Sequence, residues 1–96
     1  MKIHITKGSV LDDLGLDAGE AENLKIRAAL MRAIEAEMKQ QKLTQVVAAQ
    51  RLGISQPRVS DLVRGKVHSF TIDCLITLLL KLGKPVRLII DDRLAA

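Results

Sequence analysis

The stretch LTQVVAAQRLGISQPRVSDLVRG, residues 43–65, decides the fold of this 96-residue chain. Its pattern predicts two short helices joined by a tight turn. Gly53 lies where such a turn needs a positive φ, which glycine adopts without steric cost. Ser55 can cap the second helix, and Pro57 is tolerated in its first turn because the N–H groups there lack intrahelical partners. The residues expected to pack between the two helices are small or apolar: Ala48, Ala49, Leu52, Ile54, Val59 and Leu62.

These residues also carry a family resemblance. The run L-T-Q-x-x-x-A-x-x-L-G-I-S-Q-x-x-V-S-x-L-x-x-G, present from Leu43 to Gly65, resembles the phage-repressor-like (Cro/cI, or XRE) helix-turn-helix family. The flanking segments GSVLDDLGL (8–16), FTI (70–72) and LGKPV (82–86) resemble the HigA-type antitoxins of that family. The resemblance implies a mainly α fold, a lambda-repressor-like helix-turn-helix bundle of about five helices with a short carboxy-terminal β-strand. An apolar alternation over residues 1–6 makes a second strand available at the amino terminus.

The resemblance also implies what the protein does. Antitoxins of this type neutralise a RelE/HigB-like, ribosome-dependent RNase toxin and repress their own operon. We therefore expect a sequence-specific DNA-binding transcriptional repressor that is the antitoxin of such a pair. Two alternatives stay open: a stand-alone XRE-family regulator without a toxin, and a protein-interaction module with a vestigial DNA-binding motif.

The length of the chain fits a single domain, residues 1–96. Within it, we expect a strand and turn over 1–16, a helical core over 17–83 with the helix-turn-helix at 44–65, and a terminal strand over 85–91. Apolar side chains at helical spacing predict the buried stripe of a long helix that ends near residue 40. The stripe consists of Leu24, Ala28, Met31, Ile34 and Met38.

Charge is distributed unevenly along the chain. The net charge is +4, but residues 38–90 carry nine basic and two acidic side chains, whereas residues 1–37 carry five basic and seven acidic ones. The basic part therefore contains the helix-turn-helix. Such an asymmetry favours binding to a phosphate backbone, which supplies most of the affinity for DNA that is independent of sequence.

By the resemblance, the second helix of the motif enters the major groove of double-stranded DNA. Gln56 can make two hydrogen bonds to adenine, and Arg58 can fork onto guanine. Pro57 has no N–H to donate to a phosphate and can instead contact a thymine methyl group. Asp61 can accept from a cytosine amino group or pair with Arg58 or Arg64. The expected DNA-binding residues are Gln45, Ser55, Gln56, Pro57, Arg58, Ser60, Asp61, Arg64 and Lys66.

The terminal strand needs a pairing partner, because an exposed apolar strand edge promotes aggregation. Its apolar side chains point to both faces: Val86, Leu88, Ile89 and Ile90. Two partners are available, the segment Ile3–Ile5 and the same strand of a second copy of the chain. Of these we expect the second copy, so these four residues are the predicted dimerisation contacts of a homodimer on a near-palindromic operator.

A short amino-terminal segment is the expected contact with the toxin. It combines two carboxylates with neighbouring apolar side chains, which suits a basic protein surface. Its residues are Val10, Leu11, Asp12, Asp13 and Leu14.

Other activities find little support in the sequence. Cys74 is the only cysteine, and we expect a buried, inert thiol. His4 and His68 lie far apart without further ligands around them, so no metal or other cofactor is expected. No catalytic signature occurs, so we expect no enzyme, and no small-molecule substrate. No apolar run has the length of a membrane span, so a cytoplasmic protein is expected.

Overall fold

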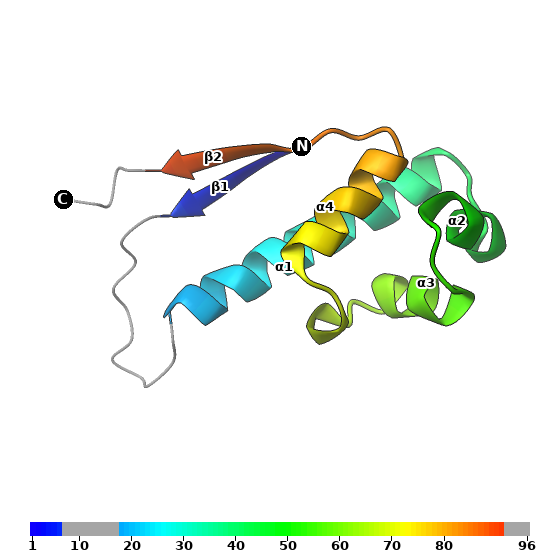
Figure 1. The fold of residues 1–96 in the computed structure, drawn as a ribbon, viewed down its shortest axis with the longest axis horizontal. Helices are drawn as coiled ribbons and strands as arrows, with labels where there is room; N and C mark the ends of the chain where they lie inside the picture. The colour runs from blue at the N-terminus through cyan, green and yellow to red at the C-terminus, as the bar shows by residue number, and fades with distance from the viewer. Residues whose placement is uncertain (7–17, 92–96) are drawn as a thin grey trace.

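The computed structural model describes residues 1–6 and 18–91, which form four α-helices and one small sheet (Figure 1). In chain order the elements are β1 (Lys2–Thr6), α1 (Ala18–Gln40), α2 (Gln45–Leu52), α3 (Gln56–Val63), the 3₁₀ turn η1 (Val67–Ser69), α4 (Ile72–Lys81) and β2 (Arg87–Asp91). The mainly helical class is therefore confirmed. Four α-helices stand in the described residues where about five were expected, and the turn expected before residue 17 lies outside those residues.

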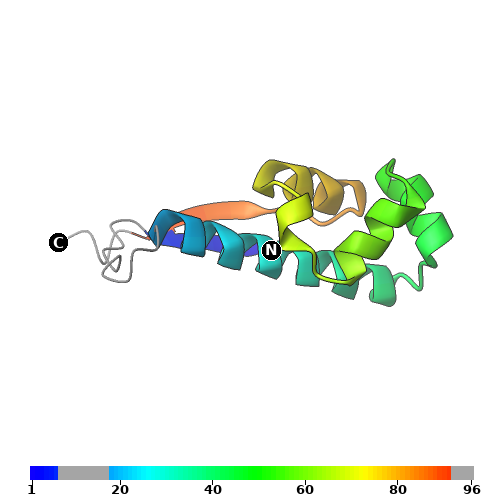
Figure 2. The same cartoon turned by 90° about the horizontal axis from the view of Figure 1, so that it is seen from below.

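Helix α1 runs along the long axis of the molecule, with α4 packed along it and α2 and α3 at its carboxyl-terminal end (Figure 2). Its buried stripe starts at Ile26 and Leu30, where the sequence analysis expected Leu24 and Ala28, which are only half-buried. The difference arises because β1 approaches α1 and brings Ile3 beside Ile26. The rest of the predicted stripe is confirmed: Met31, Ile34 and Met38 are buried.

The start of α4 is capped by a side chain. The Thr71 hydroxyl oxygen accepts a hydrogen bond from the Cys74 N–H at 3.3 Å. Phe70 and Leu75, before and after this cap, are both buried, as a hydrophobic staple requires. The Cys74 side chain is half-buried rather than fully buried.

All four helices end in the same way, with a residue in the left-handed region and a hydrogen bond that spans five residues. At the end of α1, the Leu43 N–H donates to the Met38 carbonyl at 2.9 Å, and the left-handed residue is Lys42, with φ of 56°. The other three helices place a glycine at the equivalent position: Gly53, Gly65 and Gly83. At the end of α1, therefore, a residue with a side chain adopts the left-handed backbone conformation that glycine adopts more easily.

The two strands pair with each other in parallel and in register from Lys2 opposite Arg87 to Thr6 opposite Asp91. The Arg87 N–H extends the ladder by donating to the Met1 carbonyl at 2.8 Å. The terminal strand thus uses the amino-terminal segment, the partner that the sequence analysis favoured less. The sheet lies at the end of the molecule remote from α2 and α3 (Figures 1 and 2).

Replacing Lys42 with glycine is expected to stabilise the fold. The relief of left-handed strain exceeds the extra chain entropy of glycine by about 0.5 kcal/mol, which corresponds to a rise of a few degrees in Tm. Urea and thermal unfolding measure the change. The matched control is Lys39→Gly, inside the last turn of α1, which should destabilise by about 1 kcal/mol. Equal losses from both substitutions would contradict the role assigned to the left-handed geometry.

Candidate DNA-binding interface

Helices α2 and α3 are each started by a side-chain cap. The Thr44 hydroxyl oxygen accepts from the Val47 N–H at 3.2 Å, and the Ser55 hydroxyl oxygen accepts from the Arg58 N–H at 3.3 Å. Pro57 stands in the first turn of α3, as the sequence predicts. Because each cap satisfies an N–H that has no partner inside its helix, the starting points of both helices are well defined.

The turn between the two helices depends on Gly53, whose φ is 71°. A Cβ atom added at this position would lie 3.3 Å from the Nζ of Lys81. That ammonium group donates to the Leu52 carbonyl at 3.0 Å, so a side chain from α4 caps the carboxyl end of α2. The role of Gly53 was predicted; the role of Lys81 was not, because it depends on the packing of α4 near the turn.

The packing between α2 and α3 agrees with the sequence analysis at five of six positions. Ala48, Ala49, Leu52, Val59 and Leu62 are buried. Ile54 is half-buried and packs at the edge of the core. The burial of Val59 and Leu62 fixes which side of α3 points away from the protein.

That outer side carries most of the residues expected to contact DNA. Gln56, Pro57 and Arg64 are exposed, as are Gln45 and Ser55 at the start of the two helices. Ser60 and Asp61 are half-buried. The family resemblance also implies that Gln45 braces Gln56, but among the described residues no hydrogen bond joins these two side chains.

Asp61 pairs with Lys66 rather than with either arginine considered from the sequence. The Lys66 Nζ lies 3.5 Å from the Asp61 carboxylate, and both side chains reach solvent. The pairing follows from the end of α3, where the chain turns back and the Lys66 N–H donates to the Asp61 carbonyl at 3.0 Å. An expected phosphate contact therefore lies beside an expected base contact.

Arg58 does not extend freely from α3. Its guanidinium carbon lies 4.1 Å from the centroid of the Phe70 ring, and its Nη1 donates to the Ser69 carbonyl at 2.8 Å. The pattern of the motif predicts an outward fork of Arg58 toward guanine instead. These contacts could not be predicted because they depend on how the turn at Val67–Ser69 brings Ser69 and Phe70 back beside α3.

A second arginine, from a different helix, binds the same turn. Arg27 of α1 donates through Nη1 to the carbonyls of Val67, at 3.0 Å, and Phe70, at 3.2 Å. Its Nε donates to Asn23 Oδ1 at 2.6 Å. Arg27 is a functional residue that was not predicted; its one signal in the sequence is a basic side chain next to Ile26, which is buried in the core.

The turn also leads into a charged helix start. A hydrogen bond with the Thr71 side chain holds the pKa of the Asp73 carboxyl below its ordinary value. The carboxylate therefore stays negatively charged in the first turn of α4, where it suits the positive end of the helix dipole.

The remaining predictions concern the toxin contact, metal ions and membrane spans. The predicted toxin-binding segment, Val10 to Leu14, lies outside the described residues. In the parts of the chain that are described, His, Cys and acidic side chains form no group of three that could hold a metal ion. The helices described over residues 18–91 include none with the length and apolar character that a bilayer span requires.

Comparisons with known proteins agree with this geometry. Residues 10–91 match a family described as "Helix-turn-helix domain". A solved structure described as "Putative XRE Family Transcriptional Regulator" is 38% identical in sequence and superposes with a TM-score of 0.72. The match covers 75% of this chain and 81% of that one. No curated protein sequence gives a significant match.

Proposed function

The chain belongs to the helix-turn-helix domain family, with an XRE-type motif, and we propose that it is a sequence-specific DNA-binding transcriptional repressor. One observation carries the proposal: α3 is held by its cap at Ser55 and by its buried apolar side chains, so that Gln56, Pro57 and Arg64 remain exposed. The excess of basic residues over 38–90 adds the electrostatic attraction that DNA binding requires. Access to an operator places the protein in the cytoplasm, and we take residues 1–96 as one domain.

In the proposed complex, α3 lies in the major groove with its first turn against the base edges. The Gln56 amide donates and accepts toward an adenine, and the Pro57 ring contacts a thymine methyl group. Ser60 and Asp61 lie further along the helix. Gln45 and Ser55 at the helix starts, together with Arg64 and Lys66 at the end of α3, are assigned to the phosphates.

Two substitutions separate base reading from phosphate binding. Gln56→Ala should weaken operator binding by about 1–3 kcal/mol and relax the preference at one base pair. Lys66→Ala should weaken binding to all sequences alike and reduce the salt slope by about 1. Fluorescence titrations with DNA from the chain's own upstream region, at several salt concentrations, measure both effects.

The matched control is Gln50→Ala, an exposed glutamine on α2 outside the proposed interface, which should leave affinity unchanged. If the unmodified protein bound no DNA with salt dependence, the repressor proposal would fail and the interaction module would remain.

We also propose that the repressor is a homodimer joined through β2. In the described sheet β2 pairs with β1 on one side, and its other edge has no strand beside it. Leu88 and Ile90 are 55% and 63% exposed, and Val86 and Ile89 are half-buried. A two-fold axis would let the same edge of a second copy complete the ladder, and it would match a near-palindromic operator with half-sites about one helical turn apart.

Leu88→Lys is expected to convert the dimer to a monomer, because the charge opposes burial at the joined edge. Light scattering at micromolar concentration measures the mass, and circular dichroism checks the helical content. Leu80→Lys on α4 is the matched control, since Leu80 is equally exposed at 55%. A monomeric unmodified protein, or dissociation caused only by Leu80→Lys, would contradict the assignment to β2.

The finer proposal is that the repressor is the antitoxin of a RelE/HigB-like RNase toxin. Its support is the resemblance of the flanking segments to HigA-type antitoxins, with Val10, Leu11, Asp12, Asp13 and Leu14 as the assigned toxin contact. The stand-alone regulator fits the helix-turn-helix equally well, so the decision rests on the product of the adjacent gene.

Co-expression with the adjacent gene should rescue growth, and the two proteins should co-purify. Replacing Asp12 and Asp13 with lysine should abolish rescue while operator binding persists. The same replacement at two acidic residues near the start of α1, Glu20 and Glu22, serves as control and should preserve rescue. A harmless neighbouring gene product, with operator binding intact, would favour the stand-alone regulator.

A further inference from the structure

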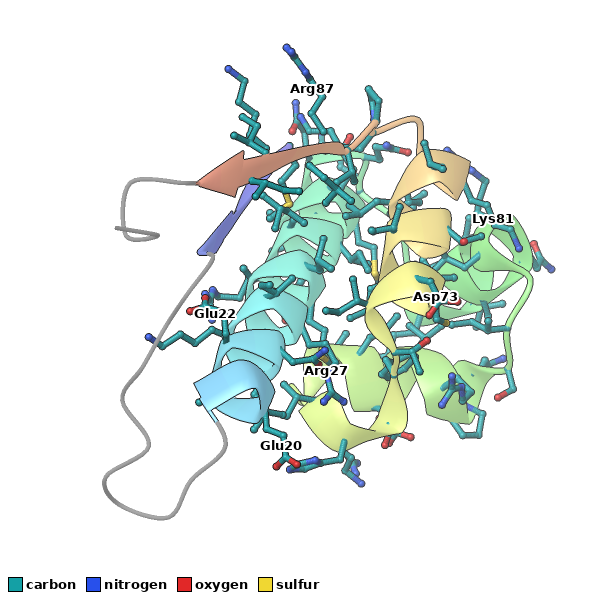
Figure 3. All side chains as sticks on the ribbon, turned by 60° about the vertical axis from the view of Figure 1, so that its left-hand side comes forward. Glu20, Glu22, Arg27, Asp73, Lys81 and Arg87 are labelled. Atoms are coloured by element: carbon teal, nitrogen blue, oxygen red, sulfur yellow. The ribbon has the colours of Figure 1, made fainter. Side chains whose placement is uncertain are left out.

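The turn that follows α3 is bound by two arginines that come from different helices. Arg27 of α1 donates to the carbonyls of Val67 and Phe70, and Arg58 of α3 donates to the carbonyl of Ser69. Figure 3 shows Arg27 reaching from α1 toward this turn. Together the two guanidinium groups bind three of the four backbone carbonyls between residues 67 and 70.

The Arg58 guanidinium is committed on a second side as well. It lies over the Phe70 ring at 4.1 Å, and that ring is only 2% exposed. The cation therefore covers a buried side chain of the core. Leaving this position for a guanine would cost Arg58 its contact with the ring, and it would leave the Ser69 carbonyl without the donor that it has here.

The turn held in this way belongs to the proposed interface. It begins at Lys66, whose ammonium group lies beside Asp61 of α3, and the Ser69 N–H donates to the Lys66 carbonyl at 3.0 Å. A shift of the turn therefore moves a phosphate contact relative to the recognition helix. Arg58 belongs to α3 itself, so its contacts with Ser69 and Phe70 fix the position of the turn relative to that helix.

We propose that Arg58 is a positioning residue: it holds the turn over 66–70 against α3 and stays on Phe70 when DNA is bound, so it reads no base. This inference rests on the proposed DNA-binding function. It assigns base selection to the exposed start of α3, at Gln56 and Pro57, and it makes Arg27 a second member of the same support.

Arg58→Met tests the proposal because it keeps the aliphatic stem and removes the charge and the hydrogen bond. Affinity should fall by the same factor, about 3- to 10-fold, for the operator and for each single-base variant of it. Arg27→Met should produce the same uniform loss from α1. Arg32→Met, at an exposed arginine of α1, is the matched control and should change nothing.

A change of preference at one base pair in Arg58→Met, absent from Arg27→Met, would overturn the proposal and make Arg58 a base reader. Thermal unfolding of every variant checks that it folds. If Arg58→Met does not fold, Arg58→Lys takes its place, because it keeps the charge but loses the planar fork.

A spectroscopic readout decides the point in the unmodified protein. Phe70 is the only Phe, Tyr or Trp of the chain, so an upfield ring-current shift of the Arg58 side-chain protons has one aromatic source of that kind. The shift should be present in the free protein, absent in Phe70→Leu, and retained in the operator complex. Its loss on operator binding would show that Arg58 leaves the ring and would overturn the proposal. Failure of the unmodified protein to bind DNA would instead overturn the proposed function.

Discussion

The packing of α3 against α2, under a left-handed turn at Gly53, is the constraint on which the exposed polar face depends. Val59 and Leu62 are buried on the inner side of α3, while Gln56 and Arg64 are exposed. A rotation of α3 would expose these apolar side chains, at a cost of about 1.5–3 kcal/mol for each one fully exposed. The orientation of the polar residues is therefore set by aliphatic packing that itself makes no contact with a ligand.

The parts of the fold that depend on local signals could be predicted from the sequence. The predicted cap at Ser55 and the left-handed Gly53 need only residues a few positions away, and both are confirmed. The caps at Thr44 and Thr71 follow the same local rule. The buried residues between α2 and α3 follow from helical spacing in the same way. For the candidate site, these signals identified the two helices and the exposed start of α3.

The rest of the site depends on side chains that bind backbone carbonyls far along the chain. Lys81 reaches Leu52, and Arg27 reaches Val67 and Phe70 across forty positions or more. Nothing in the spacing of a long, flexible cation specifies such a partner, because many carbonyls lie within its reach. The same limit explains why the contacts of Arg58 with Phe70 and Ser69 were not predicted, and why a second copy of the chain was preferred to Ile3–Ile5 as the partner of the terminal strand.

The parallel pairing of β1 with β2 also shapes how the molecule assembles. It joins Ile3 to Leu88, almost the whole described length of the chain, whereas the helical contacts join nearer segments. Closing so long a loop costs entropy that the ladder must offset, so we expect the sheet to form after the helices and to open before them. On this expectation the strands separate, and exchange between two copies, while the helix-turn-helix keeps its structure.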